Sequence, residues 1–168
     1  MSRPPGQAED VRAAMIRDIV YSLRALLTES DRIAHGFAME HRLSPSDFRA
    51  LLHVVTSETD GTPLAASDLR SRLNVSAGAI TYIIDRLVKA GLVRRDADPS
   101  DRRKVILRLS EQGFELCRSY FEPIQTGHAR ALAEVSEHDL TATEAVLDAL
   151  LVAMRSPAPD TELIETFE

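Results

Sequence analysis

The fold is decided by the stretch Ser76-Ala77-Gly78-Ala79-Ile80-Thr81-Tyr82-Ile83-Ile84-Asp85-Arg86-Leu87-Val88-Lys89. Its large apolar residues recur at i, i+3, i+4, i+7 and i+8, which predicts a helix with one side packed on a core. The other side carries small, hydroxyl and basic side chains, which suit contacts to base edges and phosphates. Gly91 follows the last turn and is expected to end the helix.

A shorter helix and a hairpin are expected on either side. Residues 67–73 form the preceding helix, and Asn74-Val75-Ser76 forms the turn. Downstream, residues 92–95 and 104–109 are predicted as strands joined by the loop 96–103, whose Asp-Pro-Ser-Asp composition is typical of a rigid turn. The second strand is expected to place on one side Val105, Leu107 and Leu109.

Six motifs in this region occur at a characteristic spacing. They are Leu64-Ala65-Ala66-Ser67-Asp68-Leu69, Leu73-Asn74-Val75-Ser76, Asp85-Arg86-Leu87, Gly91-Leu92-Val93, Asp98-Pro99-Ser100-Asp101-Arg102-Arg103 and Leu109-Ser110-Glu111-Gln112-Gly113. Together they resemble the MarR family of winged helix-turn-helix transcription regulators, over about residues 40 to 118. The family often has a capping Thr where Ala65 stands and an Arg where Tyr82 stands. Ser67 is expected to cap a slightly later helix start instead.

The resemblance implies a mainly α fold with a small β-hairpin wing and with dimerisation helices at both ends. It also implies a homodimer that represses transcription from a pseudo-palindromic DNA site and is released by a ligand or an oxidant. The residues expected to bind DNA are Ser76, Gly78, Thr81, Tyr82, Arg86, Arg102 and Arg103. Asp98 and Asp101 are expected to orient the wing, because an acid beside DNA is otherwise unfavourable.

Charge is distributed unevenly along the 168 residues. The net charge is −6, yet residues 86–108 hold eight Lys/Arg and three Asp/Glu, a local charge of +5, against −11 elsewhere. A basic patch on an acidic body suits a protein that contacts DNA with one face. The first residues contain no apolar signal-peptide region and no window is apolar enough for a membrane span, so a cytoplasmic protein without membrane contact is expected.

The remaining sequence predicts long helices. Residues 1–8 are expected to be a disordered arm, 9–43 an N-terminal dimerisation helix and 44–109 the winged helix-turn-helix region, with a helix starting at Ser44-Pro45-Ser46-Asp47. Residues 110–155 are expected to form C-terminal dimerisation helices, kinked at Pro123, and 156–168 an acidic tail. Apolar residues at spacings of three and four in the end helices favour contact with a second subunit.

A small aromatic or phenolic effector is a further expectation. It would enter a crevice where the first long helix, the Ser44 helix and the Ser110 helix meet, lined by Phe37, His41, Phe48 and Phe114. The alternative is that these aromatic rings simply fill core. Cys117, the single cysteine, lies in an apolar seam, which favours an inert buried thiol over an oxidant sensor.

Other classes of function find less support. His35, Glu40 and His41 are poorly spaced for a metal site on one helix face, so no metal and no cofactor are expected. No catalytic motif is present, which argues against an enzyme. A winged-helix module that binds protein is the main alternative, but it would not need Arg94, Arg95, Arg102, Arg103 and Lys104. A structural subunit of a larger assembly also stays open.

Overall fold

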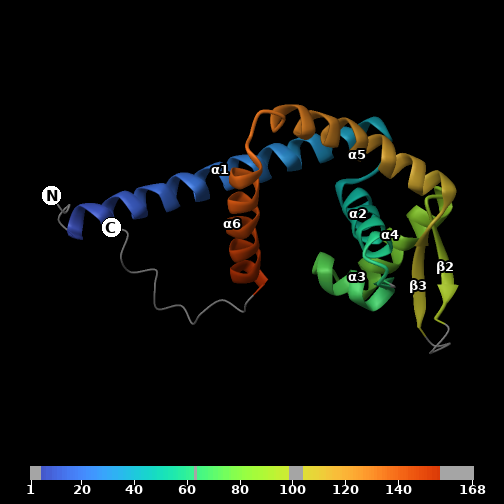
Figure 1. Cartoon of the computed structure of the whole chain (residues 1–168). Helices are drawn as coiled ribbons and strands as arrows, with labels where there is room; N and C mark the ends of the chain where they lie inside the picture. Colours follow the sequence, from blue (N-terminus) through green and yellow to red (C-terminus); the bar gives the residue numbers. More distant parts are fainter. Residues whose placement is uncertain (1–4, 63, 99–103, 156–168) are drawn as a thin grey trace. The chain divides into compact units, whose positions relative to one another are not determined.

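The computed structural model describes residues 5–62, 64–98 and 104–155, with side chains from Asp10 onward. The elements follow the order α1 (Pro5–Glu40), α2 (Pro45–Thr59), β1 (Leu64–Ala65), α3 (Ala66–Leu73), α4 (Ala77–Lys89), β2 (Val93–Ala97), β3 (Val105–Leu109), α5 (Glu111–Ala131) and α6 (Glu137–Arg155) (Figure 1). The mainly α architecture with a small β wing is therefore confirmed. The chain divides into two compact units, Met1–Glu122 and Pro123–Glu168, which are described separately.

The sheet has three antiparallel strands in the order β1-β3-β2. Strand β1 has only two residues, Leu64 and Ala65, which pair with Leu107 and Ile106 of β3. So short a strand carries no alternating pattern, which is why the sequence predicted a two-stranded hairpin alone.

The expected burial of β3 needs a correction. Val105 is 40% exposed and Ile106 is buried, whereas the sequence placed Val105 on the apolar side. Strand β1 pairs with Leu107 and Ile106 of β3 but does not reach Val105. Within this sheet, Val105 therefore pairs with β2 alone. Consecutive burial of Ile106 and Leu107 shows that both faces of β3 are covered there.

Helix α2 forms the floor on which α3, α4 and the sheet pack. Its start matches the expectation, because the Ser44 side chain accepts a hydrogen bond from the Asp47 amide at 3.1 Å and Pro45 occupies the first turn. The buried residues of this core, from α2, α3 and α4, are Phe48, Leu51, Val54, Leu69, Ile80, Ile83, Ile84 and Leu87. The apolar stripe predicted for α4 is therefore its buried side, except that Val88 is partly exposed.

Helix α3 begins without a side-chain cap. Its N-cap is Ala65, which is held by β1 and makes no capping hydrogen bond with its side chain. The expectation that Ser67 caps a later start is wrong, because Ser67 already lies inside the helix and its hydroxyl bonds Asp68 at 3.4 Å. The strand pairing of Ala65 fixes the start of the helix instead.

Two glycines let α5 pack closely on the end of α4. Gly91 has φ +72° directly after the C-cap of α4, as expected for a glycine that ends a helix. A Cβ on Gly113 would lie 2.0 Å from the carbonyl oxygen of Leu92, so no other residue fits there without a shift of backbone. The Ser110 hydroxyl caps α5 by accepting from the Gly113 amide at 2.9 Å.

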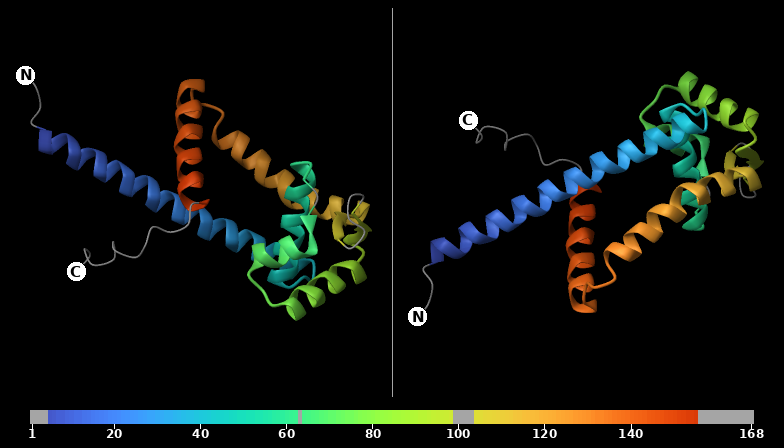
Figure 2. Two further views of the ribbon diagram at one scale, coloured as in Figure 1. Left: turned by 90° about the horizontal axis from the view of Figure 1, so that it is seen from below. Right: turned by 90° about the horizontal axis from the view of Figure 1, so that it is seen from above.

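Helix α1 is one uninterrupted helix of 36 residues (Figure 2). It starts at Pro5, so residues 5–8 are helical where the sequence suggested an arm; proline suits the first turn because it lacks an amide hydrogen. Much of its apolar seam is exposed in the single chain, including Met15, Ile19, Leu26 and Ile33.

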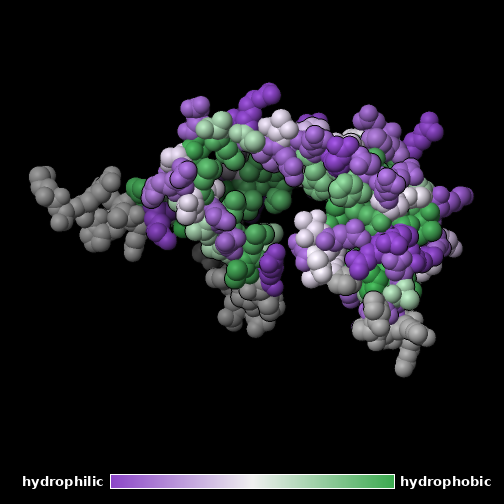
Figure 3. All heavy atoms as spheres, turned by 45° about the vertical axis from the view of Figure 1, so that its right-hand side comes forward, coloured by the Kyte–Doolittle hydropathy of each residue, from purple (hydrophilic) through white to green (hydrophobic). Residues whose placement is uncertain are grey.

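The second unit contains the end of α5, which continues through Pro123, and α6. The Ser136 side chain caps α6 by accepting a hydrogen bond from the Asp139 amide at 3.2 Å. No residue of α6 is buried, and its exposed large apolar residues are Leu140, Val146, Leu147, Leu151, Val152 and Met154. Figure 3 shows apolar residues in green on the surface of the protein, among hydrophilic residues in purple. None of the helices in the described ranges has a stretch apolar enough to cross a membrane.

Candidate nucleic-acid interface

The outward side of α4 is a candidate DNA-contacting face. Ser76 is the N-cap and its hydroxyl accepts from the Ala79 amide at 3.2 Å, so this side chain is partly committed to the helix. Gly78 and Thr81 are exposed, and Tyr82 is 70% exposed. The Thr81 hydroxyl donates to the Ala77 carbonyl at 3.1 Å. The outward side of α4 therefore exposes to solvent three of the residues predicted to bind DNA, namely Gly78, Thr81 and Tyr82.

Arg86 is engaged inside the protein. Its Nε donates to Asp47 Oδ2 at 2.9 Å and its Nη2 donates to Asp47 Oδ1 at 2.6 Å. Asp47 is only 4% exposed, while the side chain of Arg86 is 51% exposed. The hydrogen bonds to Asp47 raise the pKa of Arg86, so the guanidinium stays charged. This bidentate pair joins α2 to α4, and it gives Arg86 a structural role that the sequence pattern does not indicate.

A second ion pair holds α4 from the side of the wing. Arg95 of β2 donates from Nη2 to Asp85 Oδ1 at 2.5 Å. Its neighbour Arg94 pairs with Asp96 at 3.3 Å, and Arg108 lies 3.9 Å from Glu58. Asp85 and Arg86 therefore tie the same turn of α4 to two different elements.

The base of the wing is closed by the Asp98 amide, which donates to the Lys104 carbonyl at 3.1 Å. Asp98 makes a further interaction, and the orienting role expected of it stays a prediction. The predicted wing residues Asp101, Arg102 and Arg103 lie outside the described residues. Their roles stay predictions.

Two residues of this region were missed as site residues, Asp47 and Arg95. The sequence around Asp47 indicates only an acid in the first turn of a helix, and its partner Arg86 is 39 residues away. The sequence around Arg95 indicates only a basic residue of the wing. A local pattern offers no signal for either contact.

A family model described as the MarR family matches residues 43–105. The uncharacterized HTH-type transcriptional regulator YkoM of Bacillus subtilis is 31% identical over 133 residues, which cover 79% of this chain and 80% of YkoM. The chain belongs to the MarR family.

Solved structures share the fold of this MarR-family chain. A mutant of MepR from a multidrug resistant S. aureus clinical isolate matches with a TM-score of 0.68 at 16% identity, over 82% of this chain and 97% of MepR. Another S. aureus MepR mutant, bound to an oligodeoxyribonucleotide, matches with a TM-score of 0.53 at 18% identity, over 82% and 98% of the two chains. Membership of the MarR family makes the protein a DNA-binding transcriptional regulator and not an enzyme.

The aromatic residues predicted to bind an effector are only partly brought together in this MarR-family fold. Phe37 packs on His41, Phe48 and Tyr120, with ring centroids 4.2, 5.2 and 5.1 Å apart. Phe114 is 54% exposed and has no aromatic partner within the described ranges. Of the four predicted residues, Phe48 is buried at 2% exposed and Phe37 is partly buried, whereas His41 is exposed, so the set neither fills the core as a whole nor lines one crevice.

A cavity of about 530 Å³ nevertheless lies among α1, α2 and α5. Of the four predicted residues, Phe48 lines it; His41 lines a different hollow beside Leu92 and Gln112. The polar and aromatic residues of the α1–α2–α5 cavity include Asp31, Arg32, His35, Arg49 and Tyr120. Arg32 is engaged by Glu29 at 2.5 Å, whereas Arg49 makes no ion pair with any described residue.

Cys117 is buried in α5, and burial raises the pKa of its thiol to about 12. The side chain is therefore a neutral thiol at physiological pH, which agrees with the prediction of an inert residue. Across the described ranges, no three His, Cys, Asp or Glu residues gather closely enough to hold a metal ion.

Proposed function

We propose that the protein is a homodimeric repressor that inserts α4 of each subunit into the major groove of a pseudo-palindromic operator. The observation that carries this proposal is the exposed side of α4, fixed by the Asp47–Arg86 and Asp85–Arg95 pairs with Gly78, Thr81 and Tyr82 facing outward. Ser76 shapes the start of the helix, and Arg102 and Arg103 contact the DNA backbone or minor groove. This activity takes place in the cytoplasm, where chromosomal DNA is accessible.

Homodimerisation is supported by apolar surface at both ends of the chain. Met15, Ile19 and Leu26 on α1 are exposed in the described part of the chain, and so are Leu140, Leu147 and Leu151 on α6. Contiguous apolar surface of this kind marks protein interfaces. A two-fold symmetric dimer also explains how two copies of α4 reach half-sites about one DNA turn, roughly 34–36 Å, apart.

Control by a small effector is supported by the cavity among α1, α2 and α5. Phe48 and Tyr120 offer aromatic walls, and Arg49 offers a cation that no described carboxylate neutralises. An aromatic or phenolic acid matches both features. Because the cavity touches both α1 and the α2 floor under α4, a ligand that favours another spacing of the two α4 helices weakens DNA binding by linkage.

The test combines selection of DNA with measurement of mass. The purified protein is used to enrich sites from a random library, and the complex is then sized by analytical ultracentrifugation with and without aromatic carboxylates. Enrichment of an inverted repeat and a complex of two chains per site support the proposal. A monomer at every concentration, or a complex that no competitor DNA distinguishes by sequence, contradicts it.

A further inference from the structure

The outward side of α4 offers DNA no uncommitted arginine. All residues of α4 are described, and its single arginine, Arg86, directs Nε and Nη2 to Asp47. The acid beside it, Asp85, is neutralised by Arg95. Lys89 makes no ion pair within the described residues, but it is the last residue of α4, away from the N-terminal half that contacts base edges. Helix α4 therefore has no uncommitted arginine for the bidentate contact by which proteins commonly recognise guanine.

The hydroxyls near the helix start both bond to the backbone of the helix itself. Ser76 Oγ accepts from the Ala79 amide, and the Thr81 hydroxyl gives its hydrogen to the Ala77 carbonyl. Beside these hydroxyls, the exposed residues Ala77, Thr81 and Tyr82 offer a Cβ, a methyl group and an aromatic ring. The N-terminal half of α4 thus presents a neutral surface made mainly of carbon.

Tyr82 has room for a ligand beside it. Side chains of a helix lean toward its N-terminus, so Tyr82 leans over position 78, one turn earlier. Gly78 stands there, and a Cβ added to it would meet nothing within 4 Å. A large aromatic ring that is 70% exposed next to an open glycine has no packing role in the described part of the chain.

In the major groove, the apolar feature of the base pairs is the 5-methyl group of thymine. We infer that Ala77, Thr81 and Tyr82 recognise thymine methyl groups, so that each half-site is specified by thymines at the positions under the N-terminal half of α4. This inference rests on the proposed insertion of α4 into the major groove, and it adds the chemical class of base that α4 selects.

Deoxyuridine provides a direct test, because it pairs as thymine does and lacks only the methyl group. Each thymine of the selected operator is replaced in turn, and the dissociation constant is measured at fixed salt. We expect one or two thymines per half-site whose replacement weakens binding about fourfold, and about fifteenfold when both half-sites are changed. The other thymines should be insensitive.

Protein variants then assign the contacts. Thr81→Ser keeps the hydroxyl bond to Ala77 and removes only a methyl group, so it should abolish the penalty at one sensitive thymine. Tyr82→Ala should abolish it at another, while Tyr82→Phe keeps it, because the ring and not the phenolic hydroxyl makes the contact. Circular dichroism and unfolding of each variant verify the fold.

The outcomes separate this inference from the proposed function. Specific binding that tolerates deoxyuridine at every position overturns the thymine contact and leaves the regulator intact. Loss of binding in Tyr82→Phe equal to that in Tyr82→Ala would mean that the hydroxyl bonds a phosphate or base, and it also overturns the inference. Absence of any sequence preference would overturn both.

Discussion

Replacing Arg86 with methionine should destabilise the protein more than replacing Asp47 with asparagine, although both changes break one ion pair. The difference follows from burial, because Asp47 is 4% exposed and the Arg86 side chain is 51% exposed. Without Arg86, the Asp47 carboxylate stays in the core and loses both guanidinium donors. Removing one partner of a buried pair costs about 3–5 kcal/mol, and the half-exposed guanidinium places this pair near the lower end.

Asp47→Asn should cost about 1 kcal/mol, because the guanidinium it leaves can turn toward water and the amide is neutral. The double variant gives the sharpest result. Asp47→Asn should restore part of the stability lost in Arg86→Met, since it removes the buried charge that has no partner. If the two residues acted independently, adding Asp47→Asn to Arg86→Met would lower the stability further instead of raising it.

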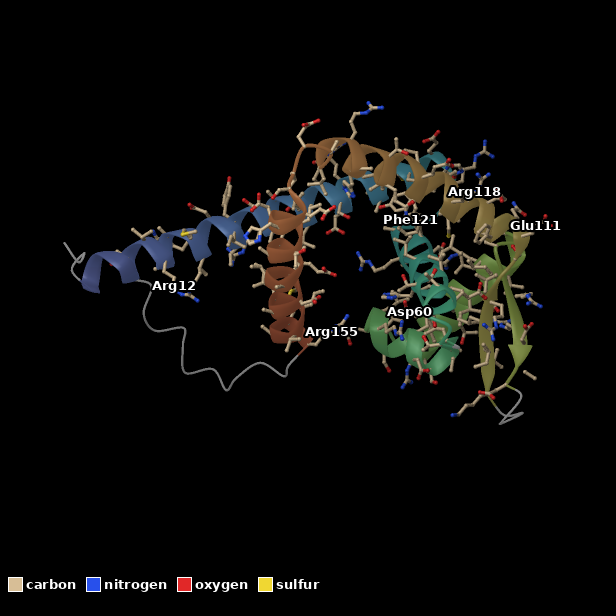
Figure 4. All side chains as sticks on the ribbon, viewed as in Figure 1. Arg12, Asp60, Glu111, Arg118, Phe121 and Arg155 are labelled. Carbon is tan, nitrogen blue, oxygen red and sulfur yellow. The ribbon has the colours of Figure 1, made fainter. Side chains whose placement is uncertain are left out.

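The assay is urea unfolding at one fixed protein concentration, because the stability of a dimer depends on concentration. Arg118→Met is the matched control. Arg118 projects from α5 (Figure 4) and pairs with Glu115 at 2.5 Å, with both side chains more than half exposed. An exposed pair contributes about 0–1 kcal/mol, so this variant should differ little from the parent. Equal losses in Arg86→Met and Arg118→Met, or no recovery in the double variant, would refute the argument.

Three other predictions concern the wing, the α5 junction and the thiol. The double substitution Arg102→Ala with Arg103→Ala should weaken binding to all DNA sequences alike. The slope of log K against log salt concentration should fall by about one unit for each phosphate that a subunit no longer binds. An unchanged slope in titrations at several salt concentrations would remove both residues from the DNA interface. Gly113→Ala should cost about 3 kcal/mol or more in unfolding measurements, because its Cβ would lie 2.0 Å from the Leu92 oxygen, whereas Gly127→Ala, with open space around it, should be neutral or stabilising. Burial raises the pKa of Cys117 from 9.0 to about 12 in the folded protein, so between these pH values the thiol loses its proton in the unfolded chain but keeps it in the folded one. The free energy of unfolding should therefore fall as the pH rises above about 9. The same pH series on Cys117→Ala should lack this contribution.

Much of the fold could be predicted because its elements carry strong local signals. The serine cap at Ser44 and the glycine at position 91 mark helix ends through bonds made within one turn. Strand β1 and the start of α3 could not be predicted in the same way. They depend on pairing between Ala65 and Ile106, residues far apart in the chain, and a two-residue strand has no periodicity.

The candidate site likewise contains residues that local sequence signals predict and one residue that they do not. The exposure of Gly78, Thr81 and Tyr82 follows from the helical period of α4, which the sequence displays. The role of Arg86 does not, because an arginine on the polar side of a helix has the same local pattern whether it binds a phosphate or a buried aspartate on another helix. Its distinguishing partner, Asp47, lies on α2 and meets Arg86 only through the packing of α2 against α4.

These contacts also change how the local positive charge is distributed. Of the eight cations in residues 86–108, Arg86, Arg94, Arg95 and Arg108 each pair with a carboxylate of the protein itself. Ion pairing thus lowers the positive field over α4, and the roles predicted for Arg102 and Arg103 in the wing loop would supply attraction to phosphate. If the wing provides most of the charge and α4 most of the base contacts, then wing variants should change salt dependence without changing site preference. Variants of Thr81 and Tyr82 should do the reverse, because a methyl contact releases no counterion.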